Sequence, residues 1–223
     1  MAGAVLLDSL SPEALEAIGN TPGAELTPGG LKLTVVRYQK PEQAGERSIR
    51  TGVFFLPELK SPYQRYYTTG KVGYGGSKRY EGSRIYHNPL FVRAASGGRA
   101  PKLAYDYLVG QGNYEDMRSR VIKATMWSRT PDAIENLLSY YQGDSSLAYD
   151  ILRHSTVGNT LAYAIQEHIV AATVRRAGYD AVIGYTKILG GWRLSEVFDV
   201  KMEYYPEVNP LRRSRAGVRR RTK

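Results

Sequence analysis

Three runs in the first half of the chain have the two-residue period of β-strands. Residues Leu31–Tyr38 alternate between apolar and polar and then become apolar, and Arg50–Leu56 form a second run that Pro57 ends. Arg84–Val92 form a third run, which is interrupted at Asn88-Pro89 because proline cannot donate to a strand ladder. The pattern predicts strands over these stretches.

A short helix is predicted before the first strand. Ser11 is a suitable N-cap, Pro12 suits the first helical position and Glu13 suits the positive end of the helix dipole. Gly19 ends this helix, and residues 20–30, with two Thr-Pro-Gly units, have the composition of a loop. Residues 1–30 carry four acidic residues and no basic one, so we expect an acidic N-terminal arm with a short helix.

The pattern changes to helical spacing over residues 101–178. Thr130-Pro131-Asp132 caps one predicted helix, and the last and longest helix is closed by Gly178. Strands are predicted again over residues 179–184 and Leu194–Val200. The order of strands, helices and strands indicates an α+β fold, with a single domain over residues 31–205 and a basic tail over residues 206–223.

The amino-acid composition limits which kinds of protein and which kinds of binding site are expected. A length of 223 residues with 42% hydrophobic residues is enough for one sizeable core. The absence of cysteine excludes disulfides and thiolate nucleophiles, and the three histidines lack metal-ligand spacing, so we expect no metal site. No apolar run is long enough to cross a bilayer, and the first residues lack the basic region of a signal peptide, so no membrane association and no secretion are expected.

The net charge of +10 is concentrated in two stretches. Residues 61–86 interleave basic side chains with tyrosines, a mixture that suits nucleic acid or a protein interface. Residues 212–223 carry seven basic residues and no acidic one. The residues predicted to bind nucleic acid or a partner are Arg65, Tyr67, Lys78, Arg79, Arg219, Arg220 and Arg221.

Five short motifs follow one another along the chain: Leu33-Thr-Val-Val-Arg37-Tyr38, Thr51-Gly-Val-Phe-Phe55, Asn88-Pro89-Leu90, Ala177-Gly-Tyr-Asp-Ala-Val-Ile183 and Ser195-Glu-Val-Phe-Asp199. Their order resembles that in the ADP-ribosyltransferase-like proteins of bacteriophages and bacterial toxins. The resemblance spans about residues 31–205 and implies a mixed or antiparallel split sheet with a helical segment between its two halves. In that family the 61–86 region also forms the loop over NAD, a third interpretation of this stretch.

The resemblance implies that NAD is a substrate and that Glu196 is the catalytic carboxylate. Nicotinamide departure leaves a cationic ribose, which a nearby carboxylate stabilises electrostatically. The chain has no Glu-x-Glu motif, since Leu194 stands two residues before Glu196, and this disfavours modification of arginine specifically.

The resemblance also implies a set of NAD-binding residues. The planar fork of Arg37 suits phosphate oxygens or the nicotinamide ribose. Tyr38 is expected to line the NAD site beside it, and Thr51 takes the position of a Ser/Thr hydroxyl. Phe54 or Phe55 forms a wall of the nicotinamide pocket, and strand alternation allows only one of them to do so.

Three functions follow as hypotheses. The first is a phage- or toxin-type mono-ADP-ribosyltransferase that moves ADP-ribose from NAD to a macromolecular target. The second is a phage virion structural or assembly protein on a degenerate form of the same fold, with its basic surface binding a partner and with an oligomer as one possible form. The third is a nucleic-acid-binding module. The expected location is the host cytoplasm or the phage virion.

Overall fold

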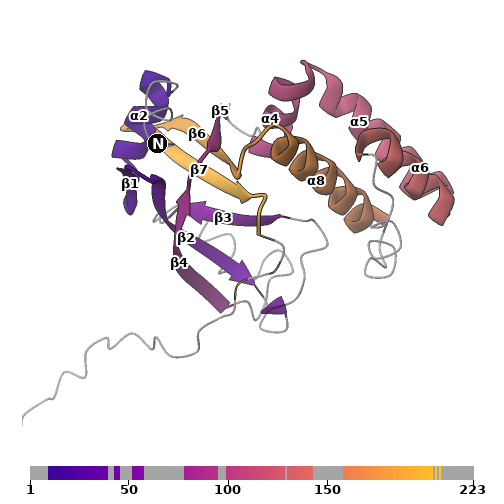
Figure 1. Ribbon diagram of the computed structural model, residues 1–223, viewed down its shortest axis with the longest axis horizontal. Helices are drawn as coiled ribbons and strands as arrows, with labels where there is room; N and C mark the ends of the chain where they lie inside the picture. The colour runs from indigo at the N-terminus through magenta and orange to yellow at the C-terminus, as the bar shows by residue number, and fades with distance from the viewer. Residues whose placement is uncertain are drawn as a thin grey trace, which may run out of the picture.

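The chain has an α+β fold with a curled mixed sheet (Figure 1). The computed structural model describes residues 10–39, 43–45, 52–57, 78–94, 99–128, 130–142, 158–202, 204 and 206. The elements are, in order, α2 (Pro12–Gly19), β1 (Ala24–Thr27), β2 (Gly30–Gln39), β3 (Val53–Pro57), β4 (Lys78–Tyr86), β5 (Pro89–Arg93), α4 (Ala100–Val109), α5 (Asn113–Lys123), the π-helical turn η2 (Ala124–Ser128), α6 (Pro131–Gln142), α8 (Gly158–Arg176), β6 (Ala181–Ile188) and β7 (Gly191–Asp199).

The strands form one seven-stranded sheet in the order β1-β2-β3-β7-β6-β5, and β4 pairs with β2. Strands β5 and β6 pair in parallel, whereas the other pairs are antiparallel. A parallel pair needs a long crossover, and the helices α4 to α8 provide it. The helical segment therefore lies between two groups of strands, as the order of the sequence patterns indicated.

Strand β3 joins the two halves of the sheet. Its last residues, Leu56 and Pro57, pair with Val36 and Val35 of β2, whereas Val53–Phe55 pair with β7. The first residues of β3 therefore pair with one half of the sheet and its last residues with the other. Pro57 is the last residue of this strand rather than the residue that stops it.

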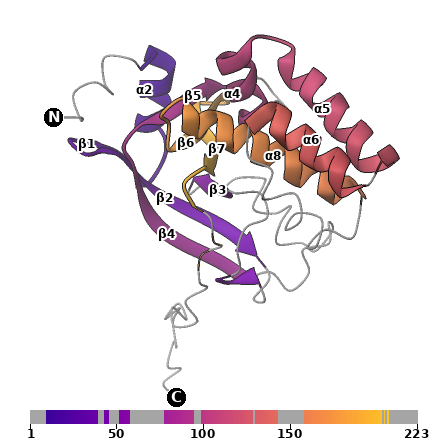
Figure 2. The ribbon, with the colours of Figure 1, turned by 45° about the vertical axis from the view of Figure 1, so that its right-hand side comes forward.

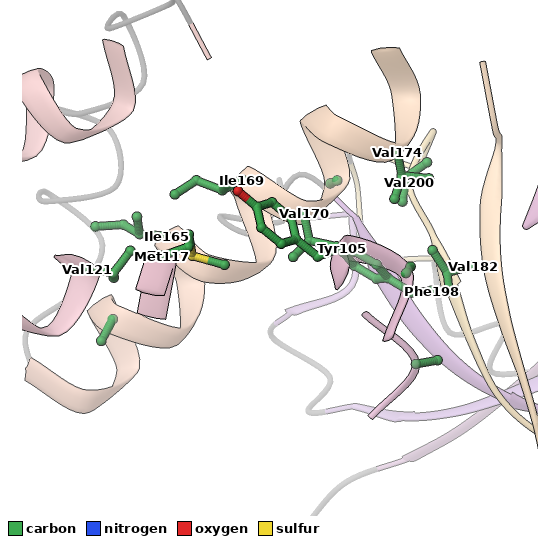
Figure 3. Packing of buried hydrophobic residues seen from close by; sticks show 14 of the residues in the cluster. Tyr105, Met117, Val121, Ile165, Ile169, Val170, Val174, Val182, Phe198 and Val200 are labelled. Atoms are coloured by element: carbon green, nitrogen blue, oxygen red, sulfur yellow. The ribbon is translucent and has the colours of Figure 1, made fainter. Parts of the chain in front are cut away.

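The sheet separates two hydrophobic cores. Helix α4 packs on β5, β6 and β7, α8 and α5 pack against α4, and α6 packs against α8 on the same side of the sheet (Figure 2). Val174 and Phe198 belong to the larger core, which fills the space between helices and strands (Figure 3). Helix α2 covers the opposite face, where Ile18 packs in a smaller core that includes Leu33 and Phe55. Residues on the two faces of one strand thus belong to different cores.

Helix α2 is fastened to strand β7 by side-chain hydrogen bonds. Ser11 caps the helix by accepting a bond from the N–H of Ala14 at 3.2 Å. Glu16 Oε1 and Thr21 Oγ1 then accept bonds from the N–H groups of Trp192 and Leu194 at 3.1 and 3.0 Å. These bonds give hydrogen-bond partners to N–H groups in the part of β7 that does not pair with β3. The segment that we expected to be an acidic arm therefore carries a helix that packs on the sheet.

Several boundaries differ from the sequence pattern. Strand β1 lies within residues 20–30, where a loop was expected, and β4 begins inside the Tyr- and Gly-rich stretch. The interrupted run over residues 84–92 is divided between β4 and β5, which are separated by His87 and Asn88. Two helix ends agree with the pattern: Thr130 Oγ1 accepts a bond from the N–H of Ala133, and Gly178 has a positive φ of 88° after α8.

Candidate functional site

A β-bulge in strand β7 determines where Glu196 points. The ladder pairs Tyr185 with Leu194 but Gly184 with Glu196, so Ser195 is an extra residue. Leu194 belongs to the smaller core, whereas Phe198, two residues after Glu196, belongs to the larger one. The bulge therefore places Glu196 on the face that the helices cover.

The carboxylate of Glu196 meets the N-terminus of helix α4. Its Oε1 accepts a hydrogen bond from the backbone N–H of Ala100, the first residue of that helix. Gly184 makes this approach possible, because a Cβ at that position would lie 3.1 Å from the Cβ of Ala100 and 2.9 Å from Ser195 Oγ. The bond to Ala100 therefore fixes one oxygen of the Glu196 carboxylate.

Burial raises the pKa of the Glu196 carboxyl above its ordinary value. The hydrogen bond from Ala100 and the nearby charge of Arg99 oppose this effect and lower the pKa, but burial is the largest cause. A half-buried carboxyl with a raised pKa is one of the features that mark functional sites, although structural carboxyls share it.

Arg99, whose charge acts on Glu196, also contacts a second carboxylate, that of Glu167. Its Nη2 is 3.3 Å from Glu167 Oε1, and its guanidinium lies over the ring of Phe54 at 5.2 Å from the centroid. The side chain of Glu167 is only 6% exposed, whereas that of Arg99 is 53% exposed. Arg99 therefore covers a buried acid and presents part of its cation to solvent.

Phe54 connects this cluster to strand β7. Its ring stacks on that of Phe198, with centroids 4.4 Å apart and planes inclined by 17°. Phe55 points to the opposite face and is buried in the smaller core, as strand alternation requires. Of the two phenylalanines, Phe54 is the one beside Arg99. We call Phe54, Arg99, Glu167 and Glu196 the Glu196 cluster.

Arg37 lies where β2 and β3 separate. Its Nη1 donates to the carbonyl oxygen of Phe54 at 2.7 Å, and its Nε donates to Gln39 Oε1 at 3.1 Å. Strand alternation puts Arg37 on the face of Leu33, opposite the face of Glu196. The structure therefore links Arg37 to the Glu196 cluster through the backbone of Phe54, and the two side chains approach the junction from different faces of the sheet.

The remaining predicted residues lie away from the Glu196 cluster or outside the described residues. Tyr38 is half-buried opposite Arg79 in the ladder, and Arg79 forms an ion pair with Glu81 at 2.9 Å. Lys78 begins β4. The predictions for Thr51, Arg65, Tyr67, Arg219, Arg220 and Arg221 fall on residues outside the described part of the chain.

Sequence reasoning missed Arg99 and Glu167. Glu167 carried a signal, because an acidic residue stands within the apolar repeat of a helix at Ile165 and Ile169. Arg99 carried none, since an arginine before Ala-Pro is an ordinary residue ahead of a helix. Only the packing of α4 against α8 brings the two side chains together.

Within the described residues, no group of His, Asp and Glu side chains is arranged to hold a metal ion. None of the helices described is long and apolar enough to cross a membrane. Comparisons with protein-family models, with curated proteins and with solved structures find no match to this chain.

Proposed function

We propose that this chain is a mono-ADP-ribosyltransferase that moves ADP-ribose from NAD to a macromolecular target at the Glu196 cluster. The observation that carries the proposal is the Glu196 carboxylate, which is half-buried, fixed through one oxygen and near the charge of Arg99, whose guanidinium lies over the ring of Phe54.

The reaction breaks the bond between the ribose C1′ and the nicotinamide nitrogen, and the bonding electron pair leaves with nicotinamide. A nucleophile of the target then forms a bond to C1′ and loses its proton to solvent. Positive charge develops on the ribose in the transition state, so a carboxylate already in place stabilises it without reorganisation. Glu196 Oε2 is the oxygen available for that role.

Two other members of the cluster have properties that suit NAD. The guanidinium of Arg99 has several N–H donors, of which one is directed at Glu167, and its exposed part suits a pyrophosphate oxygen. The ring of Phe54 offers an aromatic wall beside that cation, as a nicotinamide site requires.

Arg37 has a positioning role in this proposal. Its Nε and Nη1 both donate to protein groups, and the bond from Nη1 holds the carbonyl of Phe54 where β2 and β3 separate. Arg37 therefore fixes the strand that carries the aromatic wall. This differs from the direct contact with NAD that the resemblance implies.

Release of nicotinamide from NAD in the absence of a target tests the proposal, because water can replace the target nucleophile. We expect Glu196→Gln to slow release about 100-fold or more, since the amide keeps the bond to Ala100 but loses the negative charge. Glu115→Gln is the control, because Glu115 is a half-exposed acid on α5 that pairs with Lys102. Equal rates for the wild type and Glu196→Gln would remove the catalytic role of this carboxylate.

A virion structural or assembly protein is the second candidate, and the bond between Glu196 and Ala100 is equally consistent with it. A carboxylate that accepts from the first N–H of a helix stabilises that helix end whether or not the site is catalytic. In that case no nicotinamide is released, NAD does not raise the melting temperature, and Glu196→Gln changes only stability.

A further inference from the structure

Among the described strands, β4 is an edge strand along its whole length. All of its residues from Lys78 to Tyr86 pair with β2, and within the described residues no strand pairs with its other side. It is the outermost strand beside β2 in both views (Figures 1 and 2). An exposed edge presents a row of unpaired N–H and C=O groups that can bind another strand.

The core holds β4 in place and leaves one face of it exposed. Tyr80 packs toward the smaller core at 6.3 Å from the ring of Phe55, and Tyr86 is buried there. The alternate residues Arg79, Glu81, Ser83 and Ile85 are exposed. The strand is thus already extended and ordered, so little conformational entropy is lost when it pairs.

We propose that β4 pairs antiparallel with β4 of a second copy of this chain, with Gly82 opposite Gly82 at the two-fold axis. This register aligns all nine residues of the strand. On the exposed face it sets Arg79 opposite Ile85 and Glu81 opposite Ser83, and on the other face Tyr80 opposite Arg84 and Lys78 opposite Tyr86. No pair in this register has like charges.

A neighbouring symmetric register is less favourable. Centring the pair on Glu81 sets Glu81 opposite itself and Lys78 opposite Arg84, and like charges directly opposite destabilise a sheet. Gly82 also suits the axis, because the Tyr80 side chain already occupies the space beside it and meets the position where a Cβ would lie. The symmetric register that aligns the full length of β4 therefore brings no like charges together.

The charges of β4 favour a protein strand over nucleic acid. Lys78 and Arg79 are basic, but Arg79 is paired with Glu81 at 2.9 Å, so a phosphate at this face would meet a carboxylate. In the proposed dimer, Ser83 of the second copy lies opposite Glu81 and can donate a hydrogen bond to it. The proposal concerns an interface and is independent of the chemistry of the Glu196 cluster.

The dissociation constant of the dimer, measured by sedimentation equilibrium, tests the proposal. Ser83→Glu places a carboxylate opposite Glu81 twice in the symmetric dimer, so we expect the dissociation constant to rise about tenfold or more. Ser119→Glu, the same change at an exposed site on α5, should leave the constant unchanged. Adding Glu81→Lys to Ser83→Glu should restore the dimer, because the new acid then faces a lysine.

Cysteine cross-linking tests the register itself, because the chain contains no cysteine. Glu81→Cys and Ser83→Cys proteins should form a disulfide-linked pair when they are mixed and oxidised, and much less when each is oxidised alone. A wild-type chain that stays monomeric up to about 1 mM overturns the proposal. A dimer that Ser83→Glu leaves intact, or one that cross-links equally in the mixture and in the single variants, overturns it as well.

Discussion

Glu196 and Asp199 lie three residues apart on β7, and burial raises the pKa of both carboxyl groups. Asp199 accepts bonds from the N–H groups of Lys201 and Met202 and lies near the charge of Arg84, so its surroundings belong to the turn that ends the strand. Glu196 instead accepts from the first N–H of a helix and lies beside a half-exposed arginine. A raised pKa thus accompanies both a carboxyl in a turn and a carboxyl at the N-terminus of a helix.

The contributions of Glu196 and Glu115 to the free energy of unfolding should change in opposite directions as the pH rises. The folded pKa of Glu196 lies above the ordinary 4.5, so its stabilising contribution is complete below that pH and is lost as the pH rises through the folded pKa. The pKa of Glu115 is lowered, mainly by the hydrogen bond from Lys102, so its contribution is present above 4.5 and is lost as the pH falls.

Urea unfolding of the wild type, Glu196→Gln and Glu115→Gln from about pH 3 to about pH 8 measures both contributions. As the pH rises, the free energy of unfolding of the wild type should fall relative to that of Glu196→Gln. Over the same range it should rise relative to that of Glu115→Gln. Parallel pH profiles for the wild type and Glu196→Gln would contradict the burial of this carboxyl.

At the scale of elements, the turn between β1 and β2 depends on Gly30. This residue has a φ of 127°, and a Cβ would clash with the backbone oxygen of Tyr86. Thr27 Oγ1 donates to the carbonyl oxygen of Gly30 at 2.9 Å and closes the same turn. The position therefore needs glycine both for its conformation and for the close approach of β4.

Gly30→Ala should lower the free energy of unfolding by about 2 kcal/mol or more, because it adds backbone strain and a clash. Gly19→Ala is the matched control, since Gly19 ends α2 with open space around it. That change should be neutral or stabilise by about 0.5 kcal/mol. If both variants lose a comparable free energy of unfolding, the β1–β2 turn does not specifically require glycine at position 30.

Local signals predicted some elements and failed for others. The spacing that includes Leu161, Ile165 and Ile169 predicted the long helix, because its apolar positions repeat over several turns. Strand β1 was missed because only three residues separate the two Thr-Pro-Gly units, and its last residue, Thr27, belongs to the second unit, so the segment resembles a continuous loop. The bulge at Ser195 was also invisible in the sequence, because it exists only through the pairing of β7 with β6.

At the scale of the whole molecule, one sheet serves two cores, and α2 completes the smaller one. Strand β3 belongs to both halves of the sheet, so the Glu196 cluster and Arg37 depend on the same five residues. The candidate residues come from β3, α8 and β7 and from the start of α4, which are far apart in the chain. Their arrangement follows from long-range packing, which a single sequence does not display.

Ile18→Ala tests whether α2 is part of this packing. Ile18 is 4% exposed, so we expect a loss of about 3 kcal/mol in the free energy of unfolding. Leu15→Ala on the same helix is the control, because Leu15 is 39% exposed and should lose less than about 1 kcal/mol. Equal and small losses would mean that α2 is an arm rather than a part of the domain.

A crystal structure of the Glu196→Gln variant with NAD tests the central claim most directly, because loss of the carboxylate should leave the NAD intact. We expect the nicotinamide ribose beside the substituted amide on β7, the nicotinamide ring against Phe54 and a pyrophosphate oxygen on Arg99. NAD bound elsewhere on the chain, or no NAD bound at saturating concentration, would contradict the assignment of this cluster.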